Sequence, residues 1–162
     1  EGTRTLAETL HKARPAGVET EVFAFGKLPL AFSARCFTAR HYNLNKDDCQ
    51  FKCLDHSEGL TLLTREKQPF LVINGIQTMS AQTYSLLHLM PELSQMGIDA
   101  VRISPQPAHT AAIVAAFERA RRGEEVAEQP QWAEHGLCDG YWFGRAGIDL
   151  AAAATTELHA GA

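Results

Sequence analysis

The order of strand-like and helix-like segments is the feature that most constrains the fold of this chain. Residues 20–26 (TEVFAFG) are rich in Val and Phe and predict a strand that Gly26 ends. Residues 98–104 (IDAVRIS) predict a second strand of the same kind. Residues 59–75 (GLTLLTREKQPFLVING) predict two strands joined by a short polar turn, which is a hairpin.

Helical periodicity separates these strand-like segments. Apolar residues recur on one face over residues 3–14 and again over 108–122, where Gly123 ends the pattern. Residues 80–97 (SAQTYSLLHLMPELSQMG) have helical apolar spacing, so we expect a helix capped by Ser80 that breaks or kinks at Pro91.

This alternation predicts an α/β fold with parallel strands, either a half barrel or an open sheet. Three or four strands cannot close a barrel, and the chain lacks an initiator Met, so we expect a fragment of a larger chain. The expected organisation is a single domain over residues 1–162. Within it we expect a cysteine loop at 35–58 and an aromatic closing segment and tail at 124–162.

Composition places the chain among globular proteins and narrows its partners. Of its 162 residues, 45% are hydrophobic and 21% charged, which suits one domain with a real core. A net charge of −4 argues against a nucleic-acid backbone as the main partner. No apolar run is long enough to span a membrane, and the first residues lack a secretory signal pattern, so we expect a cytoplasmic protein.

Three of the four cysteines lie close together in sequence and predict a metal or cluster site. Cys36, Cys49 and Cys53 have the spacing C-x12-C-x3-C, and Cys138 lies far away. An odd group of three does not form a disulfide framework, and cytoplasmic cysteine clusters more often bind metal or carry out redox chemistry. Unlinked structural thiols are the plainer alternative.

The residue types leave the nature of the site open. An iron–sulfur cluster with thiolates gathered from separated segments fits best. A zinc-stabilised structural module is a second possibility, because His41 and His56 could complete a tetrahedral site. A hydrolase with a cysteine nucleophile beside His41 is a third, although it would leave Cys49 and Cys53 without a role.

A longer motif around the first cysteine carries a family resemblance. Residues 21–53, EVFAFGKLPLAFSARCFTARHYNLNKDDCQFKC, resemble the signature E-V-F-x-H-G-A-L-C-x-x-x-S-G-x-C of the collagenase-like peptidase family. Three positions depart from this signature: Phe25 replaces its His, Pro29 its first Cys, and Ala34 the Gly before its second Cys.

Within that family, the motif is most similar to the UbiV-like proteins of oxygen-independent ubiquinone biosynthesis. NGIQTMSAQTYSLL and DAVRISPQ extend the similarity over most of the chain. The resemblance implies the C-terminal part of a (β/α)8-like barrel with an inserted β-hairpin. It also implies a [4Fe-4S] cluster held by Cys36, Cys49 and Cys53, with the fourth ligand in an N-terminal half that this chain lacks. Cys138 is the only substitute for that ligand within this chain, although its surroundings, GLCDGYWFG, read better as a packed aromatic closing segment.

The same resemblance implies a role and partners. The chain would be the iron–sulfur subunit of a hydroxylase complex that acts without oxygen on a ubiquinone precursor, paired with a UbiU-like protein in a heterodimer. A UbiT-like lipid carrier and a prephenate-like oxygen donor would be further participants. A peptidase-type hydrolase of the same family is the alternative that the family name suggests.

Three polar residues near predicted strand ends are weaker candidates for substrate binding. Arg102 could grip a carboxylate, although a salt-bridged arginine at a strand end is as good an explanation. Asn74 and Gln77 could hydrogen-bond a substrate, or could belong to a turn in which Gly75 supplies backbone freedom.

Overall fold

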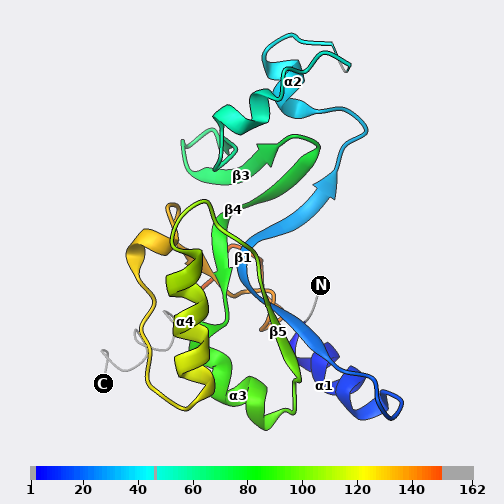
Figure 1. The fold of residues 1–162 in the computed structure, drawn as a ribbon, viewed down its shortest axis with the longest axis vertical. Coiled ribbons are helices and arrows are strands. Elements are labelled where there is room, and N and C mark those ends of the chain that lie inside the picture. Colours follow the sequence, from blue (N-terminus) through cyan, green and yellow to red (C-terminus); the bar gives the residue numbers. More distant parts are fainter. Residues whose placement is uncertain (1–2, 46, 151–162) are drawn as a thin grey trace. The chain divides into compact units, whose positions relative to one another are not determined.

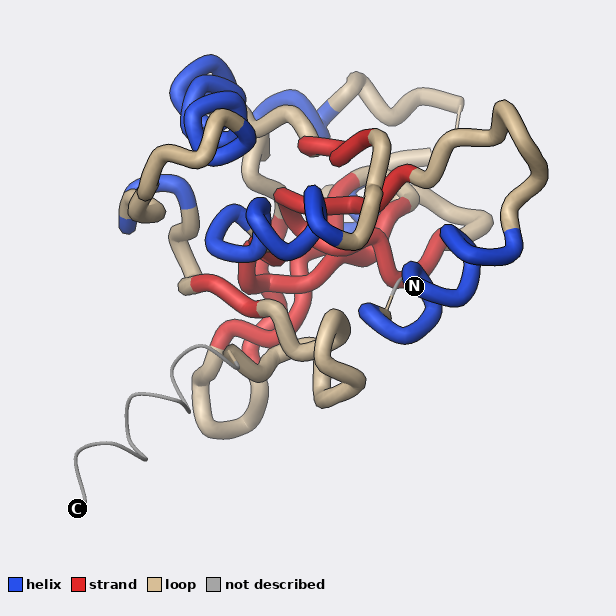
Figure 2. Tube along the Cα trace, turned by 90° about the horizontal axis from the view of Figure 1, so that it is seen from below, coloured by secondary structure: helices blue, strands red, loops and turns tan. Residues whose placement is uncertain are grey.

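The computed structural model describes residues 3–45 and 47–150, and its strands and helices are separated by long loop stretches (Figures 1 and 2). The predicted tail at 151–162 lies outside these described residues. In chain order the elements are α1 (Arg4–Ala13), β1 (Glu21–Phe32), α2 (Phe37–His41), η1 (Lys52–Asp55), β2 (Leu60–Leu63), β3 (Pro69–Asn74), β4 (Gln77–Ser85), η2 (Leu87–Leu89), α3 (Met90–Gln95), β5 (Ala100–Ile103), α4 (Thr110–Arg121), η3 (Pro130–Trp132) and β6 (Leu137–Cys138), where η marks a short 3-10 helix.

Backbone contacts divide the chain into two compact units, which are described separately. Unit 1 comprises Glu1–Gly26 and Tyr84–Ala162, and unit 2 comprises Lys27–Thr83. The strands pair in the order β2-β3-β4-β1-β5, with β6 on β4, and this sheet is open. The α/β class is therefore confirmed, whereas the barrel and the single domain over residues 1–162 stay predictions.

The core of unit 1 forms between its sheet and α4. Along α4, Ile113, Ala116, Phe117 and Ala120 are buried, which is the one-face spacing of an amphipathic helix. Phe25 of β1 is fully buried and meets the Phe117 ring edge-on at a centroid distance of 6.0 Å. The predicted helices at 3–14 and 108–122 and the predicted strand at 98–104 are confirmed by α1, α4 and β5.

The first strand does not end at Gly26, as the sequence predicts, but continues to Phe32. Gly26 has a φ of +128°, and a Cβ there would lie 2.5 Å from the Cβ of Ser104. The parallel register between β1 and β5 shifts just before it, between Phe23 and Phe25. Gly26 therefore allows an irregularity within the strand, because only glycine takes this conformation readily.

The predicted helix over 80–97 is largely wrong. Residues 77–85 form β4, and helical structure begins only at Leu87. Ala81 and Thr83 are buried while Gln82 between them is less so, which is a strand's alternation. Pro91 lies in the first turn of α3, where a missing N–H is harmless, so it begins a helix and does not break one.

Unit 2 is built on the predicted hairpin, which is confirmed. β2 and β3 are antiparallel, with Leu60 opposite Ile73 and Leu62 opposite Leu71. β3 and β4 form a second antiparallel pair, closed by a turn at Gly75. The predicted cysteine loop follows β1 and contains α2 and η1, which pack against each other. No helix in the described part of the chain is long and apolar enough to cross a membrane.

Candidate functional site

The turn between β3 and β4 holds both ends of the cysteine loop. At the first end, the Phe37 backbone N–H donates to the Gly75 carbonyl (2.6 Å), and the Gly75 N–H donates to Oγ1 of the buried Thr38 (3.1 Å). At the other end, Nδ2 of Asn74 donates to the His56 carbonyl (3.2 Å). One turn therefore anchors the backbone next to Cys36 and the backbone three residues beyond Cys53.

Cys36 is the N-cap of α2. Its backbone is extended, and its Sγ accepts a hydrogen bond from the Ala39 N–H at 3.4 Å. Ser, Thr, Asp and Asn are the usual residues here, so a sulfur acceptor is an uncommon choice for a cap. The cap fixes this half-buried thiol at the start of α2 and places it beside a backbone N–H.

A strained turn connects Cys49 to Cys53. The Lys52 N–H donates to the Cys49 carbonyl (3.2 Å), and the two residues inside this turn, Gln50 and Phe51, both have a φ near +50°. Residues other than glycine, and bulky ones above all, adopt such angles at an energetic cost. Left-handed residues followed by helical ones point successive N–H groups the same way, as in many anion and iron–sulfur sites. The C-x3-C link is thus a tight turn leading into η1.

Side chains from both halves of the loop meet around Tyr42. Its hydroxyl lies 2.6 Å from Nε2 of His56, and the two rings are stacked. The Lys52 ammonium lies over the Tyr42 ring, 5.9 Å from its centroid, and pairs with Asp55. These contacts add a second link between α2 and η1 within the cysteine loop.

The structure places the three predicted ligands in one unit but does not assemble them into a metal site. Cys36, Cys49 and Cys53 are free, half-buried thiols of unit 2. Among residues 3–45 and 47–150, no three His, Cys, Asp or Glu side chains form a group that could hold a metal ion. The anchored loop therefore carries three thiols that could bind a cluster, but the structure does not arrange them as the ligands of one site.

Cys138 differs from the other three cysteines. It is fully buried in unit 1, and burial, reinforced by the neighbouring Asp139, raises the pKa of its thiol to about 12. Because the thiolate is the form that binds metal, this environment disfavours Cys138 as a ligand.

The other polar candidates make ordinary structural contacts, as their alternative explanations predict. Arg102 lies 2.5 Å from Glu21 in an exposed ion pair at a strand end. Asn74 and Gln77 pair across the β3–β4 turn, where Gly75 has a φ of +56°. Phe25, which stands where the family signature has its His, is a core residue of unit 1 and not a site residue.

Unit 1 also contains a cluster of buried polar side chains that no sequence pattern predicted. The Ser85 hydroxyl donates to Oε1 of Glu128, and Nε2 of His88 lies 3.4 Å from Oδ2 of the fully buried Asp139. Burial is the main cause that raises the Glu128 pKa, and Asp139 raises it further, against the Ser85 hydrogen bond and His88. These residues come from β4, η2, the segment after α4 and the position just after β6, so no local pattern links them.

This cluster has the residue types of a hydrolase but not the arrangement. In the described part of the chain, the Ser85 hydroxyl donates to Glu128 and not to a histidine, and Ser85 is only 2% exposed. A serine nucleophile needs a base in contact and access to its substrate. The Ser85–Glu128 hydrogen bond links β4 to the segment that follows α4.

Comparison with known families identifies the group to which the chain belongs. No solved structure matches it. The family model for peptidase family U32, the collagenase-like peptidases, matches residues 4–144, which include both units' main elements and the whole cysteine loop. The chain thus belongs to peptidase family U32.

Proposed function

We propose that this chain binds a [4Fe-4S] cluster through Cys36, Cys49 and Cys53. The observation that carries the proposal is that three free thiols lie on one loop whose two ends are hydrogen-bonded to a single turn. Thiolates hold iron–sulfur clusters almost exclusively, and metal sites commonly assemble their ligands only on binding. Cys138 is disfavoured as a ligand by its burial and raised pKa.

In this proposal the loop residues position the ligands and tune the site. The N-cap bond from the Ala39 N–H holds the Cys36 sulfur at the start of α2, and the left-handed turn at Gln50 and Phe51 links Cys49 to Cys53. Hydrogen bonds from such groups to sulfur stabilise the more negative state of an iron–sulfur site. A bound cluster would supply one-electron transfer without oxygen.

We propose further that the chain is the iron–sulfur subunit of an oxygen-independent hydroxylase complex of ubiquinone biosynthesis. Family membership and the close likeness of residues 21–53 to UbiV-like proteins support this role. A UbiU-like protein is the proposed heterodimer partner. A UbiT-like lipid carrier and a prephenate-like donor complete the proposed system.

Anaerobic reconstitution with iron and sulfide tests the cluster directly. We expect bound iron and acid-labile sulfide in equal amounts and a broad visible absorption near 400 nm, as is usual for such clusters (about four irons per cluster). Cys36→Ala, Cys49→Ala and Cys53→Ala should each lose most of the iron. Cys138→Ala is the matched control and should retain it. Binding of zinc without sulfide would indicate a structural zinc site in place of the cluster. Iron retained in all three variants would overturn the proposal.

Exposed apolar side chains of unit 2 support the proposed partner. Phe51 and Leu54 of the cysteine loop are 70% and 78% exposed, and the end of β1 carries Phe32 at 73%. Large apolar side chains that stay exposed at a surface can form part of a protein interface. The cysteine loop and the end of β1 are therefore the proposed contact region for a UbiU-like protein.

A binding experiment tests this contact region. Titration of the chain with a purified UbiU-like protein should give a one-to-one complex. Leu54→Glu should weaken it at least about tenfold, the scale of an interface hot spot. Val114→Glu, at a 48% exposed apolar position of α4 in unit 1, should leave the affinity unchanged. Equal weakening by both variants would overturn the assignment of the contact region.

A further inference from the structure

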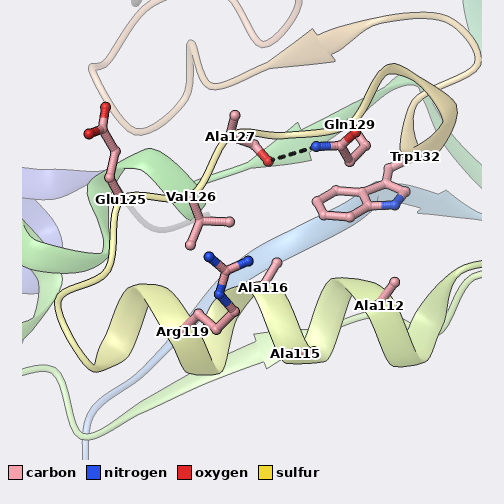
Figure 3. Close-up of a pocket in the computed structure, with 9 residues that line it drawn as sticks. All are labelled: Ala112, Ala115, Ala116, Arg119, Glu125, Val126, Ala127, Gln129 and Trp132. Atoms are coloured by element: carbon pink, nitrogen blue, oxygen red, sulfur yellow. Dashed lines mark hydrogen bonds between the residues drawn. The ribbon is translucent and has the colours of Figure 1, made fainter.

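A cavity in unit 1 lies between α4 and the segment that follows it, apart from the cysteine loop (Figure 3). Its volume is about 340 Å³, within the range of small-ligand sites. Its floor comes from α4 and its far side from residues 125–132. The lining residues that matter here are Ala112, Ala115, Ala116, Arg119, Val126 and Trp132.

The floor of the cavity is flat and apolar. Ala112, Ala115 and Ala116 lie three and four residues apart, so their methyl groups share one face of α4. Ala116 is 5% exposed and belongs to the core, whereas Ala112 and Ala115 are exposed and open to the cavity. Side chains this small let a planar molecule lie close to the helix.

One wall is an aromatic ring that the core holds in place. Trp132 meets the buried Phe25 ring edge-on, with a centroid distance of 6.5 Å and an interplanar angle of 84°. Trp132 ends η3, which Pro130 begins. The indole therefore has a fixed position from which it can pack against a second flat group.

Two charged side chains, Arg119 and Glu125, line the cavity. Nε of Arg119 donates to Glu124 (2.6 Å) in an exposed pair, and the guanidinium points toward Val126 (Figure 3). The Glu125 carboxylate points away from Arg119, and the Gln129 amide is turned to the Ala127 carbonyl (Figure 3). The two terminal nitrogens of Arg119 form the fork that suits a carboxylate.

We propose that this cavity binds a small aromatic carboxylate of one or two rings. The ring lies on the alanine face of α4 against Trp132, and the carboxylate meets the guanidinium of Arg119. The proposal concerns unit 1 alone and does not depend on the cluster proposed in unit 2.

The test uses two probes that share one ring system and differ in charge: 1-naphthoate and the uncharged 1-naphthalenemethanol. Isothermal titration of the intact chain with 1-naphthoate should show saturable one-to-one binding with a dissociation constant of about 1 mM or lower. Tryptophan fluorescence should change with the same midpoint. The alcohol should bind about tenfold more weakly, because it lacks the charge-assisted bond. Equal affinity for both probes, or no saturation by 1-naphthoate up to about 10 mM, would overturn the proposal.

Two pairs of variants locate the site, each checked for folding by circular dichroism and thermal unfolding. Ala115→Leu fills the cavity and should weaken both probes at least about tenfold, whereas Val114→Leu, at an exposed position of α4 that does not line the cavity, should weaken neither. Arg119→Gln should weaken only 1-naphthoate, to the affinity of the alcohol. Arg121→Gln removes the neighbouring ion pair with Glu118 and should change nothing. A loss of binding in Val114→Leu or Arg121→Gln as well would contradict binding in this cavity.

Discussion

The two units use their apolar side chains in opposite ways. Unit 1 contains most of the large, fully buried side chains, among them Trp142, Phe25 and Ile113. Among the described residues of unit 2, Val72 alone is a large apolar side chain buried to the same degree, while Phe32 and Leu54 are more than 70% exposed. Unit 1 thus buries its large apolar side chains in a core of its own, whereas several large apolar side chains of unit 2 remain exposed.

The cysteines give the largest expected difference between the units. Burial raises the pKa of Cys138 to about 12, so only about one molecule in 10⁴ carries its thiolate at pH 8. We expect Ellman's reagent to modify three thiols of the native chain within minutes and the fourth only after denaturant is added.

Variants of Cys36, Cys49 and Cys53 should each remove one fast-reacting thiol from this measurement, and Cys138→Ala should remove the slow one. Four fast thiols in the native chain would show that the environments of the two units do not differ in this way.

Two phenylalanines of β1, one buried and one exposed, allow the two environments to be compared by the effect of each side chain on stability. Phe25→Ala should lower the free energy of unfolding by about 3–5 kcal/mol, because it opens a cavity between β1 and α4. Phe32→Ala, at the exposed end of β1, should change it by less than about 0.5 kcal/mol. Urea denaturation measures both variants, and similar losses would mean that the end of β1 is covered in solution.

The buried cluster of unit 1 predicts a pH-dependent effect. The folded-state pKa of Glu128 lies above its unfolded value, mainly through burial, so the stabilisation from its protonated form is present below about pH 4.5 and is lost as the pH rises through the folded pKa. Glu128→Gln keeps an acceptor for Ser85 and should raise Tm at pH 7 to 8, with the gain vanishing near pH 4.

Glu118→Gln is the control of opposite sign. Hydrogen bonds from Arg121 and then Arg122 lower the Glu118 pKa to about 2, so its stabilisation is present above about pH 4.5 and is lost as the pH falls through about 2. This exposed group should have a small effect, a slightly lower Tm for the variant at neutral pH. A Glu128→Gln variant that loses stability at pH 7 would contradict the burial argument.

The smallest effect concerns the strained turn of the cysteine loop. Phe51 has a φ of +49° and is 70% exposed, so Phe51→Asn should relieve strain and gain about 0.5–1 kcal/mol of unfolding free energy. Leu54→Asn, at an equally exposed position of η1, should give no gain. A loss of stability in Phe51→Asn would show that the Phe51 side chain itself stabilises the loop.

The sequence alone was sufficient for the α/β class, the hairpin at 59–75, two helices, and the family to which the chain belongs. These features are local: helical periodicity, strand composition and motif spacing can each be read within a short window. The three cysteines were also identified as candidate cluster ligands in this way, because their spacing and their neighbours carry the resemblance.

Only the tertiary structure decided which apolar patterns became strands and which polar residues meet. Residues 77–85 form β4 and not a helix because β3 and β1 lie on either side of this segment and pair with it. Strand β1 continues beyond Gly26 because glycine has no Cβ that would clash with Ser104. Ser85 and Glu128 are 43 positions apart and meet through packing. Long-range pairing and the burial of polar groups depend on the whole fold, so no local window of the sequence contains them.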